Sequence, residues 1–165
     1  MKTTLTVARI LTWFNLIVWI GFLAILFLAV LAMQAYALLV IVFLFCAMPL
    51  HSYAALKLQK SIRFPAIRLS NQTPVGIRFI GIIALFFGFT MLANSYFTLQ
   101  NPVKTLELMK EGMAEAKGVT NAQLMGYIRG GAVFGVILGL CVIVSVVLNM
   151  RLLRWYYLVK QSDVS

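Results

Sequence analysis

The chain has 165 residues, of which 62% are hydrophobic and only 11% are Asp, Glu, Lys or Arg, and its formal net charge is +10. About a quarter of the residues in soluble domains are charged, so this composition excludes an ordinary soluble globular domain. Three long stretches, 10–56, 79–103 and 130–150, carry no charge at all. A spanning helix needs about 20 mostly apolar residues, so these stretches predict two, one and one membrane spans.

The first uncharged stretch predicts spans at about 10–33 and 37–56, joined near Gln34 by a turn that lacks Gly and Pro. Pro49 lies inside the second span and predicts a kink there, because proline has no N–H to donate. Thr73 and Pro74 are typical of an N-cap and a first helical turn, and they open a third span at about 75–99.

Asn101 and Pro102 repeat this signal for a short amphipathic helix at about 102–117, which we expect to lie on the outer membrane surface. Asn121 can cap a last helix, whose spanning part is about 127–153. No Gly/Ser-rich or Pro-rich linker separates a soluble module. The sequence therefore predicts an all-α integral membrane four-helix bundle with an interfacial helix between spans three and four, forming a single transmembrane domain over residues 1–165.

The charges predict the orientation of the bundle. The amino terminus, the link between spans two and three, and the tail carry +2, +5 and +2, whereas the link between spans three and four carries +1. By the positive-inside rule, both termini lie in the cytoplasm (N-in/C-in). This placement argues against a nucleic-acid partner and favours anionic lipid headgroups on the cytoplasmic side. The residues expected to contact headgroups are Lys57, Lys60, Arg63, Arg68 and Arg78.

These basic residues alternate with apolar ones, a composition suited to the membrane interface. Simple anchoring of the topology explains the same charges, and we favour it over recognition of a specific lipid or partner.

Glycines recur along the last span at a spacing that predicts close helix packing. Small residues at every fourth position let helix backbones approach in lipid, where hydrophobicity does not drive association. Two interpretations stay open: a contact with span one or three of the same chain, or a homo-oligomer. The glycines are Gly126, Gly130, Gly131, Gly135 and Gly139.

Several polar residues in the cytoplasmic halves of the spans lie at similar depths. At 1.5 Å per residue from the cytoplasmic ends, Asn15 and His51 lie about 7 Å deep, Ser145 about 9 Å and Asn149 about 3 Å. Polar groups in a membrane tend to face the bundle and pair with one another. Together with Ser52, these residues form the predicted polar intramembrane cluster, which serves either as ordinary interhelical hydrogen bonds or as a binding or gating site.

The residues needed for catalysis are missing from the spans. Every Asp and Glu lies outside them, so proton-coupled transport and nucleophilic catalysis lack their acid. One histidine cannot supply a metal site, and Cys46 and Cys141 form no Cys-x-x-Cys pair. We therefore expect no enzymatic activity, no metal and no cofactor.

Two short segments resemble a known family. The residues 55–62 (ALKLQKSI) with Phe64-Pro65, and the residues 77–81 (IRFIG), are similar to the basic link and the start of the third span in a family of small bacterial four-span inner-membrane proteins of uncharacterised activity. The resemblance implies a location in the bacterial inner (cytoplasmic) membrane.

These features predict a non-enzymatic small integral membrane protein that acts through helix–helix assembly as an interaction or regulatory subunit. A homo-oligomeric membrane pore or effector is the first alternative. A small lipid-binding protein or carrier that uses the polar cluster around His51 is the second. The expected partners are membrane lipids and either a second copy of the chain or another membrane protein.

Overall fold

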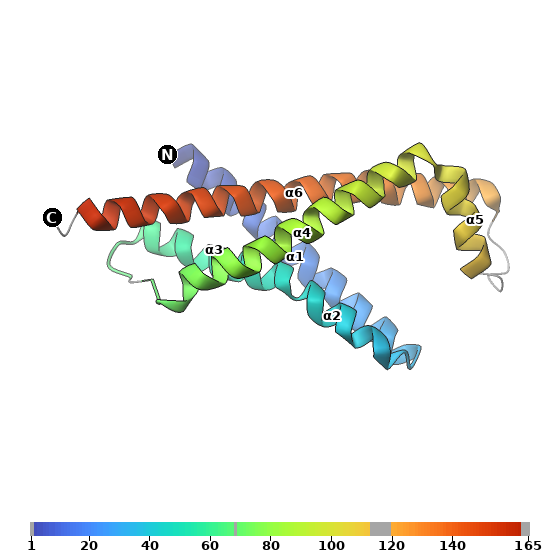
Figure 1. The fold of residues 1–165 in the computed structure, drawn as a ribbon, viewed down its shortest axis with the longest axis horizontal. Helices are drawn as coiled ribbons and strands as arrows, with labels where there is room; N and C mark the ends of the chain where they lie inside the picture. Colours follow the sequence, from blue (N-terminus) through green and yellow to red (C-terminus); the bar gives the residue numbers. More distant parts are fainter. Residues whose placement is uncertain (1, 68, 113–119, 163–165) are drawn as a thin grey trace. The chain divides into compact units, whose positions relative to one another are not determined.

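The structure is a computed structural model and describes residues 2–67, 69–112 and 120–162. Within these ranges the secondary structure is helical and contains no strand. The elements in chain order are α1 (Lys2–Ala32), the 3₁₀ helix η1 (Tyr36–Leu38), α2 (Leu39–Phe45), α3 (Ala47–Arg63), α4 (Gln72–Gln100), α5 (Pro102–Gly112) and α6 (Asn121–Ser162), as Figure 1 shows.

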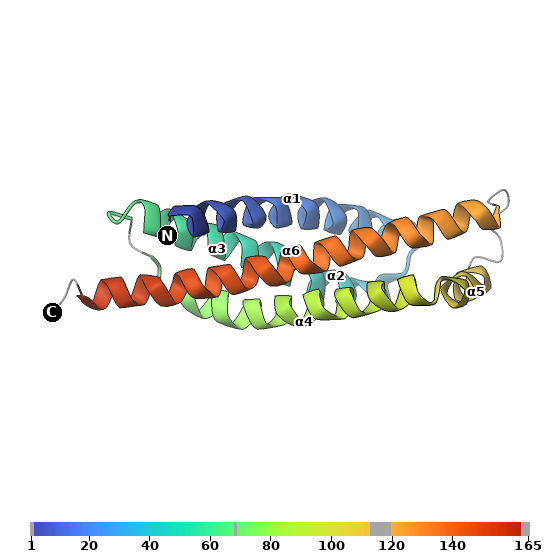
Figure 2. The same ribbon diagram turned by 90° about the horizontal axis from the view of Figure 1, so that it is seen from above.

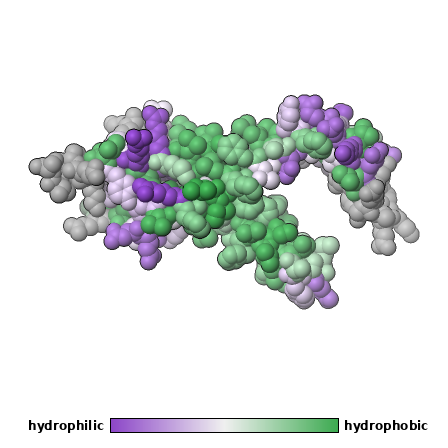
Figure 3. Space-filling view, viewed as in Figure 1, coloured by the Kyte–Doolittle hydropathy of each residue, from purple (hydrophilic) through white to green (hydrophobic). Residues whose placement is uncertain are grey.

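Four helical segments have the length and hydropathy that a membrane span needs: Thr3–Ala32, Tyr36–Arg63, Gln72–Gln100 and Asn121–Val159. The prediction of an all-helical chain with four helices of spanning length is therefore confirmed. Large apolar side chains lie on the outside of the first two segments, where Ile25 is 71% and Phe43 77% exposed. Figure 3 shows them as a hydrophobic surface over α1 and α2. Apolar exposure on this scale marks a surface that meets a membrane or another protein.

The helices form two compact units. Unit 1 comprises Met1–Phe86 and Cys141–Ser165, and unit 2 comprises Phe87–Leu140. Helices α4 and α6 each contribute one part to unit 1 and another to unit 2. The single transmembrane domain expected over residues 1–165 stays a prediction.

Four helices meet in the apolar core of unit 1 (Figure 2). Ala8 of α1, Leu58 of α3 and Ile77 of α4 are fully buried there, together with the adjacent Leu152 and Leu153 of α6. Residues from all four spanning segments thus share one cluster. This part of the chain packs as a helical bundle, as the hydrophobic pattern predicted.

The turn after α1 lies at Gln34, where the sequence placed it. Gln34 has a φ of 53°, in the left-handed region. The Ala35 N–H donates to the Val30 carbonyl at 3.1 Å and the Gln34 N–H to the Leu31 carbonyl at 3.2 Å. These two bonds form a Schellman motif, which ends many helices and usually has glycine at the left-handed position. Glutamine there explains why no Gly or Pro signalled the turn.

The second spanning segment is interrupted at Cys46, between α2 and α3. Pro49 cannot donate a hydrogen bond to the carbonyl of Phe45 four residues earlier, and the regular helix stops at that level. The break between α2 and α3 lies one turn before Pro49, the residue from which the sequence predicts a kink. Trp19 and Phe22 of α1 pack against it, with the Trp19 and Phe45 rings stacked at 5.8 Å between centroids.

Two helix starts differ from the sequence prediction by one or two residues. The cap of α6 is Thr120 rather than Asn121: the Gln123 N–H donates to Thr120 Oγ1 at 3.3 Å, and the Thr120 N–H donates to Gln123 Oε1 at 3.0 Å. This reciprocal pair is a capping box. Helix α4 begins at Gln72, so Thr73 is inside its first turn. Helix α5 begins at Pro102 as expected, and residues 113–117 of the predicted surface helix lie outside the described residues.

Candidate functional site

The structure brings the five predicted cluster residues into the interior of unit 1. Asn15 comes from α1, His51 and Ser52 from α3, and Ser145 and Asn149 from α6, and none is more than 3% exposed. Two further buried polar residues that the sequence analysis did not select join them, and these are Thr12 of α1 and Gln59 of α3.

Asn149 is the centre of a buried hydrogen-bond network, in which Gln59 Oε1 alone among the side-chain polar atoms of Thr12, Gln59 and Asn149 has no partner in the described part of the chain. Its Nδ2 donates to Thr12 Oγ1 at 3.0 Å and to the Ser145 carbonyl at 2.8 Å, while its Oδ1 accepts from Gln59 Nε2 at 2.7 Å. Gln59 Nε2 also donates to Thr12 Oγ1 at 3.1 Å, and the Thr12 hydroxyl donates to the Ala8 carbonyl at 2.6 Å. The network Thr12–Gln59–Asn149 therefore joins α1, α3 and α6.

The remaining members of the cluster bond less extensively. Asn15 Nδ2 donates to the Cys141 carbonyl of α6 at 3.2 Å, and the Ser52 hydroxyl donates to the Met48 carbonyl of its own helix at 3.1 Å. His51 Nε2 is buried and has no hydrogen-bond partner. The five predicted residues are thus close in space but do not form one continuous network.

A small cavity lies among the cluster residues that make few hydrogen bonds. It has a volume of about 10 Å³, and Asn15, Trp19 and His51 contribute to its wall. Asn15 Oδ1, Trp19 Nε1 and His51 Nε2 are all buried without a partner. A volume of this size holds about one water molecule, which needs two to four polar partners. The cavity therefore suits a single hydrogen-bonded water and is too small for an organic ligand.

The chemistry of the cluster is that of neutral hydrogen-bonding groups. Amides, hydroxyls and one imidazole meet there, and Asn149 uses both of its donors and its acceptor. Among the described residues, no group of three His, Cys, Asp or Glu side chains could hold a metal ion. Hydrogen bonds between helices in membrane proteins average about 0.6 kcal/mol each. The arrangement is suited to holding three helices in one register.

Two of the predicted packing glycines contact α4 within unit 2. A Cβ on Gly139 would lie 3.0 Å from the carbonyl oxygen of Gly88 and 3.2 Å from the backbone nitrogen of Leu92. A Cβ on Gly135 would collide with the hydroxyl of Ser95. Gly139 therefore lies directly on the α4 backbone, whereas at Gly135 the neighbour is the Ser95 side chain, which would have to shift.

The other three glycines have open space around them. A Cβ built on Gly126, Gly130 or Gly131 would meet no heavy atom of a neighbouring element within 4 Å in the described ranges 2–67, 69–112 and 120–162. Gly131 precedes Gly135 and Gly139 at the same four-residue spacing. The glycine stripe is therefore in contact with α4 over one part of its length and open over the other.

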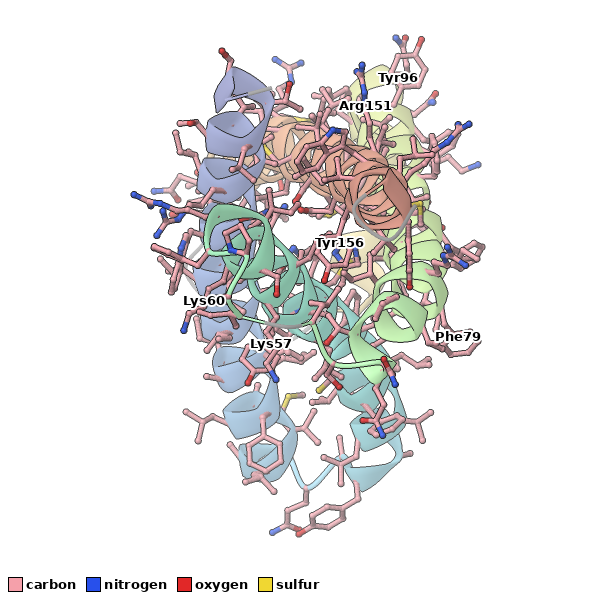
Figure 4. The ribbon with its side chains drawn as sticks, turned by 90° about the vertical axis from the view of Figure 1, so that its left-hand side faces the viewer. Lys57, Lys60, Phe79, Tyr96, Arg151 and Tyr156 are labelled. Atoms are coloured by element: carbon pink, nitrogen blue, oxygen red, sulfur yellow. The ribbon has the colours of Figure 1, made fainter. Side chains whose placement is uncertain are left out.

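The basic residues predicted to contact headgroups have exposed side chains wherever the structure describes them, and Figure 4 shows Lys57 and Lys60 on α3. Lys57 Nζ lies 4.6 Å from the centroid of the Tyr53 ring, and Arg63 Cζ lies 5.5 Å from that of Phe64. Arg68 lies outside the described residues. The exposed members are Lys57, Lys60, Arg63 and Arg78.

The sequence analysis does not select Gln59, because it predicts that the second span ends at Leu56, before the first lysine of the link. Helix α3 continues to Arg63, with Lys57 and Lys60 exposed and Leu58 and Gln59 buried. Helical periodicity across the charges is the signal that would have found it. Thr12 lies one turn from Asn15 and was overlooked because threonine often bonds to its own helix, as its bond to Ala8 does here.

Comparisons with protein-family models, with curated proteins and with solved structures find no match for this chain. The resemblance of the basic link to small bacterial four-span proteins therefore stays a prediction.

Proposed function

We propose that this chain is a non-enzymatic multi-pass protein of the bacterial cytoplasmic membrane, with both termini in the cytoplasm. It acts through helix–helix assembly as an interaction or regulatory subunit. Four helices of spanning length and the excess of Lys and Arg in the termini and the α3–α4 link support the location and orientation.

The open part of the α6 glycine stripe is the observation that carries the assembly proposal. Helix α4 already packs on Gly135 and Gly139. Small residues commonly allow such close packing between helices in lipid. Gly130 and Gly131 present the same kind of surface without a neighbour. A second helix, from another copy or from a partner protein, fits this surface.

The polar cluster supports the non-enzymatic part of the proposal. Its side chains are neutral, and Thr12, Asn149 and the amide nitrogen of Gln59 bond to one another. The cavity beside them is about 10 Å³, which leaves no room for a substrate. The cluster thus serves the packing of the subunit that presents the glycine surface.

Site-specific photo-cross-linking in native membranes tests the assembly proposal. A photoreactive benzoylphenylalanine replaces Tyr127, which is 70% exposed and one turn before Gly131. Phe43 of α2 is 77% exposed and is the matched control position. We expect a protein adduct from position 127 that disappears when Gly131→Leu is added, and none from position 43. Adducts with lipid alone at position 127, or adducts that survive Gly131→Leu, would overturn the proposal.

Cysteine labelling in intact cells tests the orientation. In a background of Cys46→Ala and Cys141→Ala, single cysteines are introduced by Ala66→Cys in the α3–α4 link and by Gln100→Cys at the end of α4, both exposed positions. A membrane-impermeant maleimide should label Gln100→Cys from outside and Ala66→Cys only after permeabilisation. The reverse pattern would place both termini outside and refute the orientation.

A further inference from the structure

A groove runs along the surface of unit 1 between the first half of α1 and the last turns of α3. Its volume is about 800 Å³, inside the range of about 300–1,000 Å³ that is usual for ligand sites. It lies apart from the Asn15–His51 cavity, and only Gln59 belongs to both its lining and the buried network. Its size and its place on the surface allow an elongated ligand to enter from the side.

Three cations converge on this groove. Arg9 lines it from α1, and Lys60 and Arg63 line it from α3. The first 106 residues of the chain contain no Asp or Glu, so no carboxylate of these segments neutralises them. Like charges held together in this way create a positive field that favours a bound anion. Arginine side chains match phosphate oxygens especially well, because a guanidinium donates two parallel hydrogen bonds.

The side chains that line the groove are both charged and apolar. Ile10, Trp13 and Leu56 line it beside the cations. Trp13 lies four residues beyond Arg9 on α1, a rise of about 6 Å, and Leu56 lies seven residues before Arg63 on α3, about 10 Å. On both helices these three apolar residues therefore lie on the predicted hydrocarbon side of the cations, while Leu5 and Phe64 add apolar lining at the predicted cytoplasmic end. A ligand that fits has an anionic head and an apolar body.

We propose that this groove binds one anionic phospholipid of the cytoplasmic leaflet. The lipid phosphate lies between Arg9, Lys60 and Arg63, and an acyl chain follows Ile10, Trp13 and Leu56. The proposal rests on the orientation proposed above, which puts the groove at the cytoplasmic headgroup level. It differs from topological anchoring because a groove site is saturable and excludes Lys57, whose ammonium lies over the Tyr53 ring outside the groove lining.

Native mass spectrometry of the full chain in detergent tests the site. Phosphatidylglycerol and phosphatidylethanolamine with identical acyl chains are titrated separately, and sn-glycerol 3-phosphate serves as the competitor that carries the phosphate without the chains. We expect one phosphatidylglycerol per chain to saturate the site, at least tenfold weaker binding of phosphatidylethanolamine, and no competition at equal concentration. Equal retention of the two lipids, or displacement by glycerol phosphate, would overturn the phospholipid site.

Charge-removing variants separate the groove from general electrostatic attraction. Arg9→Gln and Arg63→Gln should each weaken phosphatidylglycerol binding about fivefold, the effect expected of one cation near a membrane surface. Lys57→Gln removes the same charge from the same helix outside the groove and should leave the affinity unchanged. A similar loss in Lys57→Gln and Arg63→Gln would refute a defined site.

Fluorescence quenching locates the acyl chain. Trp13 is 46% exposed at the groove, so phosphatidylglycerol with brominated chains should quench it, and Trp13→Phe should abolish that part of the quenching. Quenching that persists in Trp13→Phe would place the lipid elsewhere. Binding is measured in detergent, where orientation plays no part, so a failed lipid site and a failed orientation give separate results.

Discussion

Replacing Asn149 by leucine probes the buried network most directly. Asn149 is fully buried and makes two hydrogen bonds to other helices, with Thr12 Oγ1 at 3.0 Å and Gln59 Nε2 at 2.7 Å. Such bonds average about 0.6 kcal/mol in membrane proteins and reach about 1.7 kcal/mol, so two of them contribute about 1–3 kcal/mol. Asn149→Leu keeps the branched shape of the side chain, with somewhat larger methyl groups, and removes both bonds. We expect the free energy of unfolding to fall by about this amount.

Reversible unfolding in mixed detergent, followed by circular dichroism, measures this loss. Asn94→Leu makes the same substitution at an exposed position of α4 and should change the free energy of unfolding by less than about 0.5 kcal/mol. A double-mutant cycle with Gln59→Leu then isolates the bond between Gln59 and Asn149. A coupling energy below about 0.3 kcal/mol, the usual scatter for independent sites, would refute the assignment of Asn149 as the centre of the network.

Three further predictions use the same unfolding measurement or a related one. Gly131→Ala adds a methyl group in open space and should stabilise the helix by about 0.5–1 kcal/mol, whereas Gly139→Ala meets the α4 backbone and should destabilise the protein by about 1–3 kcal/mol. Effects of the same sign at the two positions would contradict the packing described here. Gln34→Gly removes the strain of a φ of 53° and should stabilise the protein by about 1 kcal/mol. Pro49→Ala restores the N–H that can donate to the Phe45 carbonyl, so the new backbone amide at position 49 should exchange its hydrogen slowly as the helix becomes continuous, and rapid exchange there would contradict this account.

The helices were predictable because their signals are local. The stretches 10–56, 79–103 and 130–150 carry no charge, and this alone indicates helices of spanning length, independent of which helices pack beside them. The turn at Gln34 was placed correctly by length alone, since two spans had to share one uncharged stretch. Its Schellman geometry could not be predicted, because a glutamine carries no preference for a positive φ.

The site was only partly predictable, because the depth of a residue along its helix does not tell which neighbouring helix its side chain faces. Depth grouped Asn15, His51 and Asn149 correctly, and all three are buried in unit 1. It could not tell that Asn149 bonds to Thr12 and Gln59 while His51 Nε2 stays unpaired, since that depends on how each helix is rotated about its axis. The α1–α3 groove was missed for a related reason: Arg9 and Arg63 belong to segments whose pairing only the fold shows.

Gln59 links the buried network to the proposed lipid site. Its amide nitrogen donates to Thr12 and Asn149, and the same side chain lines the groove beside Lys60. Without an anion, the cations on α1 and α3 repel each other across the groove and oppose the contact that the network requires. A bound phosphate removes this repulsion, and at a concentration 100 times its dissociation constant a ligand stabilises the folded state by about 2.7 kcal/mol. That is comparable to the contribution of the network itself, so if the groove binds an anionic lipid as proposed, the lipid and Asn149 stabilise the same contacts between α1 and α3.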